Sequence, residues 1–440
     1  MYLYDIENKN IISSTGGYQQ EGLLIRDTYV RIGTGFHSIH GMFYEPVVPV
    51  EKSRIGVVII HSDDDYSIFP IGGELAKRGY RTLCGQVIDP DETLEQKMLD
   101  IKHAVEFMRN FPGIKKVVLM GHSGGATLMS AYQSVAEKGV NIYRGSNMLV
   151  KCSLEEELPP ADGLMLLDSN WGNGSMTLFS VDPAIVEVDG SIKIDPELDI
   201  FNPANGFDPN GSEYSDAFLK KFLKAQAERN NSIIRKTLDR LYMIEKGKGY
   251  YLDDEPFSAP GTAQFGPFNK LFPQDIRLLS HTKKPYPLLH GNGSITEGIV
   301  PSVRRARGEF GKDMTRLMFS AVNTTVRSFL TNRAVFAGEG YDIRDDGAYG
   351  IRWEDTFNCT PGNIRNVNIP LLIMGMTGSY EGLAAEEIYS NAASTDKTIA
   401  FVEGAGHNFD NQGREEFGDT QKIVFDYADK WMSTPGRFID

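Results

Sequence analysis

The sequence predicts an α/β protein with a mostly parallel sheet covered by helices on both faces and a large, mainly helical cap insertion. Two observations predict this architecture. Short apolar runs rich in β-branched residues alternate with segments of helical periodicity, which implies βαβ crossovers and parallel strands. The alternation breaks once, between about residues 169 and 368, where the sequence becomes more polar and its periodicity more helical. We therefore expect a core at residues 1–168 and 369–440 and a cap at 169–368.

Composition narrows the class of protein further. The chain has 440 residues, 41% of them hydrophobic and 24% charged, which is typical of a globular protein with a sizeable core. Its formal net charge of -14 argues against nucleic-acid and anionic-membrane partners, which select basic surfaces. No apolar run approaches the ~20 residues of a membrane span, and the start "MYLYDIENKN" lacks the pattern of a secretory signal.

The cysteine content favours a cytoplasmic location, as does the missing secretory signal. The chain has 3 cysteines, far apart and without metal-site spacing, so reduced thiols in the cytoplasm are the plain expectation. The sequence leaves the oligomeric state open, a homo-oligomer included.

The first part of the core is expected to hold strands and helices in alternation. Strands are expected at residues 54–61, 81–87 and 116–120, and helices at 72–80, 93–111 and from the serine turn to about Glu137. The run "RIGVVIIH" (54–61) is continuously apolar, as in a strand buried on both faces. Residues 93–111 place apolar side chains at helical spacing, and Pro112-Gly113 ends the helix.

The rest of the chain completes the pattern. Strands are expected at residues 161–168, 369–376 and 396–404, and a last amphipathic helix at 420–432. Within the interval, residues 181–211 are a polar loop region, residues 214–247 predict a long helix, and residues 312–332 predict a second helical stretch.

The stretch "KVVLMGHSGG" joins a strand to a helix through Gly121-His122-Ser123-Gly124-Gly125. This fits Gly-x-Ser-x-Gly, in which a tight turn lifts the serine hydroxyl to the top of the sheet and glycines allow the close backbone packing. The following helix aims its amides and its positive dipole end at the place where negative charge develops on a reacting carbonyl. Ser123 is therefore the candidate nucleophile.

With this turn the chain resembles the α/β-hydrolase superfamily over about residues 54–168 and 369–432. The stretch "DPELDIFNPANGF" (195–207) is similar to one in uncharacterised bacterial members with a large cap. The resemblance implies a histidine base after the final strand, and "FVEGAGHNF" supplies His407 there. It also implies two backbone oxyanion donors: Gly124, and the loop after "VVIIH", where Ser62 replaces the usual glycine and the donor is Ser62 or Asp63.

The acid of the triad is the least determined member. The resemblance places it after the strand "IPLLIMGM" or after the strand "LMLLD", so Glu381 and Asp168 are the two candidates, and we favour Glu381. An absent third member stays open as well. The run Asp63-Asp64-Asp65 is expected to be a solvated or capping loop, because adjacent carboxylates cannot all face one ion; no metal or cofactor is expected.

The resemblance implies a carboxylesterase-like serine hydrolase that forms an acyl-enzyme. Because the interval 169–368 adds many aromatic residues and pockets under lids are usually apolar, we expect a medium-sized, mostly apolar small-molecule ester. An amidase or peptidase, a carbon–carbon bond hydrolase or an acyltransferase using the same serine are alternatives. A non-catalytic ligand-binding relative is a third class.

Overall fold

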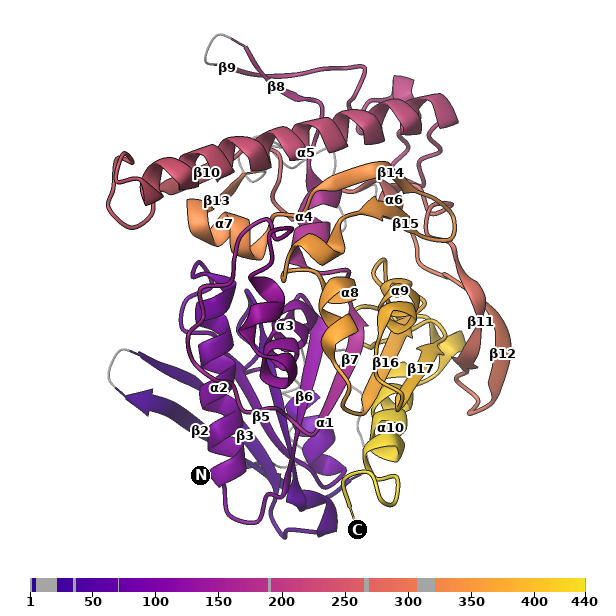
Figure 1. Ribbon diagram of the computed structural model, residues 1–440. Coiled ribbons are helices and arrows are strands. Elements are labelled where there is room, and N and C mark those ends of the chain that lie inside the picture. Colours follow the sequence, from indigo (N-terminus) through magenta and orange to yellow (C-terminus); the bar gives the residue numbers. More distant parts are fainter. Residues whose placement is uncertain are drawn as a thin grey trace.

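The computed structural model describes residues 2–4, 22–34, 37–69, 71–188, 191–264, 269–306 and 321–439. Across these residues a central eleven-stranded sheet forms the core (Figure 1). In spatial order its strands are β1 (Tyr2–Tyr4), β2 (Ile25–Thr34), β3 (His37–Pro46), β5 (Arg81–Gln86), β4 (Ile55–His61), β6 (Lys116–Ser123), β7 (Gly163–Ser169), β16 (Leu371–Met376), β17 (Lys397–Val402), β11 (His281–Leu289) and β12 (Ile295–Pro301).

The middle of this sheet is parallel. Strands β5, β4, β6, β7, β16 and β17 run in one direction, whereas β2, β3 and β12 pair antiparallel with their neighbours. The β4, β7 and β16 strands are buried along their whole length, as their continuous apolar runs predict. Because the strands are parallel, the carboxyl ends of β6, β7, β16 and β17 meet at one edge of the sheet.

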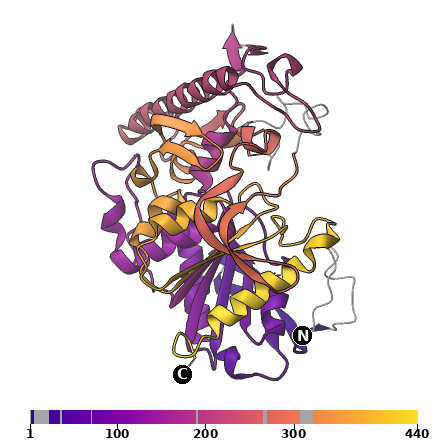
Figure 2. The same ribbon diagram turned by 90° about the vertical axis from the view of Figure 1, so that its right-hand side faces the viewer.

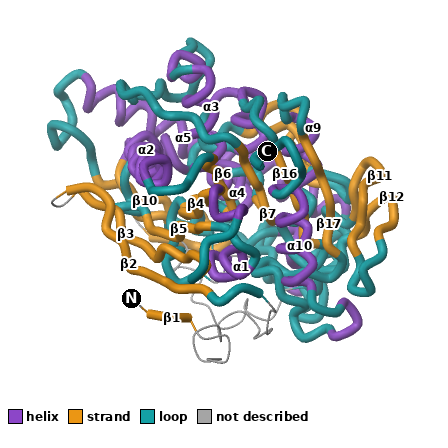
Figure 3. Tube along the Cα trace, turned by 90° about the horizontal axis from the view of Figure 1, so that it is seen from below, coloured by secondary structure: helices purple, strands orange, loops and turns teal. Residues whose placement is uncertain are grey.

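Helices cover both faces. On one face lie α1 (Ile71–Lys77) and α10 (Thr420–Met432); on the other lie α2 (Leu94–Asn110), α3 (Gly125–Lys138) and α9 (Ala384–Asn391). The β4 strand shows this directly: Val57 and Ile59 join the apolar cluster of α1 and α10, and Val58 and Ile60 join that of α2 and α3. Figure 3 shows α2 and α3 on one side of the strands and α1 on the other.

The helix boundaries follow local capping. The Thr93 side chain accepts a hydrogen bond from the Gln96 amide and begins α2, one residue from the expected start. The α10 helix begins after Asp419, whose side chain accepts from the Lys422 amide, and spans the expected residues Thr420–Met432. The core alternation is therefore confirmed.

The interval 169–368 is dominated by α5 (Asp216–Glu245), a helix of 30 residues that lies across the molecule above the sheet (Figure 1). Near it are α4 (Asn173–Ser180), α6 (Leu271–Gln274), α7 (Val326–Asn332) and the strand pairs β8 (Ile185–Val188) with β9 (Ser191–Ile194), β10 (Pro256–Ala259) with β13 (Val322–Thr325), and β14 (Ala337–Ile343) with β15 (Ala348–Ile351). The short helix α8 (Thr360–Asn363) lies lower, next to α3 and α9. Over the described ranges no helix, α5 included, has the length and apolar character to cross a bilayer.

Two elements of this interval belong to the central sheet. The β11–β12 hairpin pairs with β17 through Leu288 and Leu289, and so covers what would otherwise be an open sheet edge (Figure 2). The helical stretch expected at 312–332 differs from the structure: residues 312–320 lie outside the described residues, Val322–Thr325 form a strand, and only Val326–Asn332 are helical. β-Branched Val322, Thr324 and Thr325 suit the strand.

Candidate active site

Ser123 lies where β6 ends and α3 begins. Its backbone φ is 52°, a left-handed conformation that is uncommon for a residue with a side chain. The turn is tight enough to require glycine, because a Cβ at Gly121 would lie 2.6 Å from the Ala126 Cα. Strain of this kind costs about 1–3 kcal/mol and persists where the surroundings impose it. The turn at Ser123 is therefore tight, as the motif predicts, and its backbone is strained as well.

His407 lies in the loop after β17, and its ring contacts a carboxylate at the end of β7. The His407 Nδ1 and Asp168 Oδ2 atoms are 2.7 Å apart, and the Asp168 side chain is fully buried. The other carboxylate oxygen of Asp168 accepts a hydrogen bond from the Met376 amide at 3.1 Å. Because Asp168 is bonded on both sides, it holds the imidazole in one orientation.

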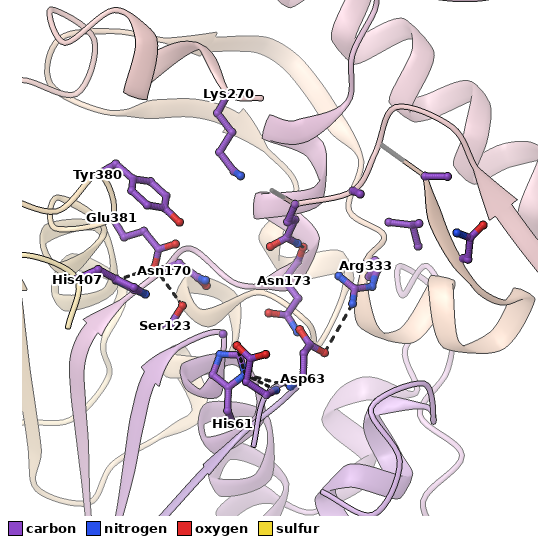
Figure 4. A pocket seen from close by; sticks show the side chains of 17 residues that line it. His61, Asp63, Ser123, Asn170, Asn173, Lys270, Arg333, Tyr380, Glu381 and His407 are labelled. Carbon is purple, nitrogen blue, oxygen red and sulfur yellow. Dashed lines mark hydrogen bonds and ion pairs between the residues drawn. The ribbon is translucent and has the colours of Figure 1, made fainter. Parts of the chain in front are cut away.

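Glu381 follows β16 and lies near the same ring nitrogen of His407. Its Oε2 is 3.8 Å from His407 Nδ1, and the Ser123 hydroxyl donates to the same oxygen at 3.5 Å (Figure 4). The structure thus brings both candidate acids to His407, and the hydrogen-bonding distance belongs to Asp168. The geometry reverses the order of preference drawn from the sequence.

These buried charges shift one another's protonation. Burial acts to lower the pKa of His407, but the Glu381 charge and the hydrogen bond and charge of Asp168 outweigh it and raise the pKa to about 9. Burial raises the pKa of Glu381, which His407 partly opposes and Asp168 reinforces. The imidazole is therefore stabilised in its protonated form.

Two further histidines hold the site, and the sequence reasoning assigned neither to this task. His122 Nε2 donates to the His407 carbonyl oxygen at 2.8 Å, and its Nδ1 accepts from the Tyr66 hydroxyl at 2.7 Å. Burial lowers the pKa of His122 well below its usual value, so the ring is neutral and can accept at Nδ1. The residue between Gly121 and Ser123 in the motif therefore anchors the loop of the candidate base.

His61, at the end of β4, orders the loop of the expected oxyanion donors. Its Nδ1 accepts hydrogen bonds from the Asp63 and Asp64 amides at 3.1 and 3.0 Å. The Asp63 N–H is therefore already used. Ser62, the other residue expected from the sequence, is fully buried, and its hydroxyl accepts from Asn173 Nδ2 at 3.0 Å. Gly124 lines the cavity as expected. A Cβ on Gly124 would lie 2.9–3.1 Å from Asn173 Oδ1, Ser62 Oγ and His61 Nε2, so a larger residue there would have to displace these side chains.

The run Asp63-Asp64-Asp65 does not converge on one point. Asp63 Oδ1 is 3.4 Å from Lys97 Nζ and 3.7 Å from the Arg333 guanidinium, whereas the Asp64 side chain is 78% exposed. Asp65 Oδ1 accepts from the Ser67 amide at 2.8 Å, which is a loop-capping contact. Among the described residues no group of three or more His, Cys, Asp or Glu side chains is placed to hold a metal ion.

Ser123 and His407 share a cavity of about 550 Å³, drawn in Figure 4. Its lining is His61, Asp63, Asp64, Ser123, Gly124, Asn170, Asn173, Ala263, Gln264, Lys270, Ala321, Val322, Asn323, Arg333, Tyr380, Glu381 and His407. Most of these side chains are polar or charged, so the expectation of a mostly apolar pocket is wrong. The physical reason is that interval aromatics pack on one another: Trp171 lies edge-on to Phe179 at 5.6 Å, and Phe179 to Phe272 at 5.5 Å.

Lys270 is the least expected member of this lining. It is 1% exposed, and its Nζ lies 6.0 Å from the centre of the Tyr380 ring. Burial lowers the pKa of Lys270 to about 7, although the Glu381 charge opposes the shift. Sequence reasoning missed Lys270 and Arg333 because each is one of many cations in an interval without a recognisable motif.

The strand order, the parallel middle of the sheet and the serine turn define the α/β-hydrolase fold. No protein-family model matches the chain, and no curated protein matches it either. Among solved structures, a hypothetical protein from Pseudomonas aeruginosa is similar at 11% identity, with 98% of each chain covered and a TM-score of 0.43.

Two esterase structures are also similar. The esterase Est1E from Butyrivibrio proteoclasticus has 11% identity, coverage of 92% of this chain and 97% of that chain, and a TM-score of 0.39. Esterase B from Lactobacillus rhamnosis has 10% identity, coverage of 92% and 86%, and a TM-score of 0.40. These values are too low for the likeness to bear on the activity of this chain.

Proposed function

We propose that the protein is a serine hydrolase that cleaves a carboxylic ester through an acyl-enzyme. Ser123 Oγ attacks the ester carbonyl while His407 Nε2 takes its proton. The tetrahedral oxyanion is held by the Gly124 and Ser62 amides. The alcohol leaves with the proton from His407, and water then attacks the acyl-enzyme with His407 as base, which returns the acid and the free serine.

The observation that supports this proposal most is the contact of His407 Nδ1 with Asp168 at 2.7 Å beside a strained Ser123. With Nδ1 engaged, Nε2 is the nitrogen left for proton transfer. The Ser123 hydroxyl donates to Glu381 at 3.5 Å, which is a long hydrogen bond. We expect it to turn to His407 Nε2 when substrate fills the cavity, since catalytic hydrogen bonds are often loose in unliganded sites.

Two further assignments rest on the same picture. Residues 169–368 act as the cap of the site, apart from the β11–β12 hairpin that extends the central sheet, because Asn173, Gln264, Lys270 and Arg333 from this interval line the cavity. The protein works in a reducing compartment such as the cytoplasm, since Cys84, Cys152 and Cys359 are free and buried.

The test is the Ser123→Ala variant with 4-nitrophenyl butyrate as substrate. Removing the nucleophile should lower kcat by up to ~10⁶-fold without loss of folding, measured by release of 4-nitrophenol and by circular dichroism. A fluorophosphonate probe should label the wild type and fail to label Ser123→Ala. The matched control is Ser433→Ala, in a serine outside the cavity lining whose hydroxyl donates to the Asp429 carbonyl at 2.8 Å.

An ester-hydrolysing Ser123→Ala variant, or a wild type that the probe leaves unlabelled, would contradict the proposal. Parallel assays with 4-nitroanilide and diketone substrates separate ester cleavage from amide and carbon–carbon bond cleavage, and we expect turnover of the ester alone.

A further inference from the structure

Arg333, one of the cations that line the cavity, contacts its carboxylate partner only at an ion-pair distance. Arg333 follows α7 directly, and its guanidinium lines the cavity that holds Ser123. In the view of Figure 4 Arg333 and His407 lie on opposite sides of this cavity. A substrate whose carbonyl is at Ser123 would therefore extend towards Arg333.

The contact of Arg333 with Asp63 is an ion pair and not a hydrogen bond. Arg333 Nη2 and Asp63 Oδ1 are 3.7 Å apart, beyond hydrogen-bonding distance. The same oxygen is 3.4 Å from Lys97 Nζ, so one carboxylate faces two cations. Burial acts to raise the pKa of Asp63, but Arg333 and Lys97 outweigh it and lower the pKa to about 2. The single negative charge of Asp63 is thus shared between Arg333 and Lys97.

The other charges around the cavity are already matched or screened. Asp168 contacts His407, and the Glu381 charge acts on both His407 and Lys270. The Asp64 side chain also lines the cavity and is 78% exposed, so water weakens its field, although its charge still acts to raise the pKa of His407. In the cluster of Lys97, Arg333 and Asp63, two cations thus lie 3.4 and 3.7 Å from one carboxylate, and the Asp91 charge also acts on Lys97. Arg333 is the cation of this cluster that lines the cavity.

Arginine is also the side chain that fits this task. Its planar guanidinium offers parallel N–H donors that match a carboxylate in two hydrogen bonds, and it stays charged at all ordinary pH values. Lys270 is less suited, because burial lowers its pKa to about 7 and its charge changes near neutrality.

We propose that Arg333 binds a carboxylate of the substrate, so that the esters cleaved are monoesters of dicarboxylic acids or similar esters with a free carboxylate. This inference rests on the proposed ester hydrolysis and names its substrate class. The carboxylate lies at Arg333 while the ester carbonyl lies at Ser123. A neutral ester of the same length fills the cavity but leaves the guanidinium without its partner.

The experiment compares two esters that differ in one charge: mono-4-nitrophenyl glutarate and its methyl ester, methyl 4-nitrophenyl glutarate. A charged hydrogen-bonded contact of this type changes affinity by about 10- to 100-fold. The wild type should therefore favour the monoester in kcat/KM by about that factor. In Arg333→Gln the ratio of the two kcat/KM values should fall towards one, mainly through a raised KM for the monoester.

The matched control is Arg327→Gln. Arg327 is on α7 itself, and its Nε donates to the Asp253 carbonyl at 2.9 Å, away from the cavity lining. The control should keep the wild-type ratio. The conservative variant Arg333→Lys should keep part of the preference that Arg333→Gln loses, since lysine retains the positive charge but lacks the two parallel N–H donors. A merely structural role for Arg333 would lower kcat/KM for both esters equally.

The two proposals fail in different ways. If Ser123-dependent turnover is present but Arg333→Gln keeps the wild-type ratio, the carboxylate site is wrong and ester hydrolysis stands. If neither ester is cleaved, ester hydrolysis is wrong, and calorimetric binding of glutarate decides on Arg333. Binding that is at least ten times weaker in Arg333→Gln than in the wild type supports the carboxylate site, and equal or absent binding overturns it.

Discussion

Two buried carboxylates on one imidazole are the most unusual feature at the scale of single residues. Asp168 is fixed by the Met376 amide and bonded to His407 Nδ1, whereas Glu381 lies further from Nδ1 and accepts the Ser123 hydroxyl. Their roles in the proposed reaction therefore differ. Asp168 orients the ring, and Glu381 adds charge that favours the imidazolium.

This division predicts a pH dependence. A base whose pKa is about 9 is mostly protonated at pH 7, so kcat/KM of the wild type should rise with pH and level off above about pH 9. Glu381→Gln removes a negative charge, which lowers the pKa of His407 and moves this rise to lower pH. While the pKa of His407 stays above 7, lowering it by one increases the neutral fraction of the imidazole at pH 7 about tenfold.

The pH–rate profiles of the wild type and of the two isosteric carboxylate variants check this. Asp168→Asn should lose about 10³- to 10⁴-fold in kcat, as expected when the orienting acid is lost. Two results would contradict the assignment. One is a Glu381→Gln variant whose kcat/KM rises at the same pH as that of the wild type; the other is a larger loss of kcat in Glu381→Gln than in Asp168→Asn.

The sequence determined the positions of Ser123 and His407 in the fold more closely than the choice between Asp168 and Glu381. Ser123 lies in a motif whose glycines are dictated by the turn, and His407 follows the last core strand. Asp168 and Glu381 follow the adjacent parallel strands β7 and β16, so both reach the same edge of the sheet. Which carboxylate bonds to His407 depends on loop conformation, including the positive φ of 45° at Asp168, and spacing alone does not fix that.

At the scale of elements, the packing of α3 against β6 sets the position of Ser123. A Cβ on Gly121 would meet the Cα and amide nitrogen of Ala126 at 2.6 and 2.9 Å. These are backbone atoms in the first turn of the helix, and a side-chain rotation cannot relieve the clash. Any larger residue at position 121 must move the helix relative to the strand.

We therefore expect Gly121→Val to lower the free energy of unfolding by about 1–3 kcal/mol and to reduce activity strongly. Urea denaturation and ester turnover measure the two effects. Gly298→Ala is the matched control, because a Cβ at Gly298 meets nothing within 4 Å; it should change the stability by less than about 0.5 kcal/mol. A Gly121→Val protein with wild-type stability would show that the turn is less tight than described.

The elements that the sequence did not predict have physical reasons of their own. The β11 strand contains Pro285 and Pro287, and proline lacks the N–H that a strand ladder uses. Towards β17 it is tolerated because the backbone pairing of β11 with β17 involves Leu288 and Leu289, beyond both prolines. Towards β12 the prolines lie opposite Ile299 and Glu297. By contrast α2 and α10 were predicted to within about one residue, since capping side chains and periodic apolar positions coincide there.

At the scale of the whole molecule, buried Lys270 links the cavity to the stability of the fold. The pKa of Lys270 is lowered to about 7 by burial, against about 10.4 in an unfolded chain. Between these values the unfolded state binds more protons, so this group makes stability rise with pH from about 7 to about 10. Below pH 7 both states are charged, and the folded state bears the full cost of burying the ammonium.

Lys270→Met should accordingly stabilise the protein at pH 6, by about 1–4 kcal/mol, and the gain should shrink towards pH 10. Urea unfolding of the wild type and the variant at both pH values measures it. Lys236→Met, on α5 outside the cavity lining, controls for the loss of a lysine. A variant that is less stable than the wild type at pH 6 would mean that the attraction of Lys270 to Glu381 outweighs its burial.

The junction of β7 with β16 has a consequence for the life of the newly made chain. Asp168 and the Met376 amide that binds it are 208 residues apart, and β7 is buried on both faces in the finished sheet. At ~5–20 residues per second a ribosome needs roughly 10–40 s to make that stretch. During this time the edge of β7 that pairs with β16 is unpaired. Until β16 emerges, the nascent polypeptide exposes an apolar strand edge of the kind that chaperones recognise.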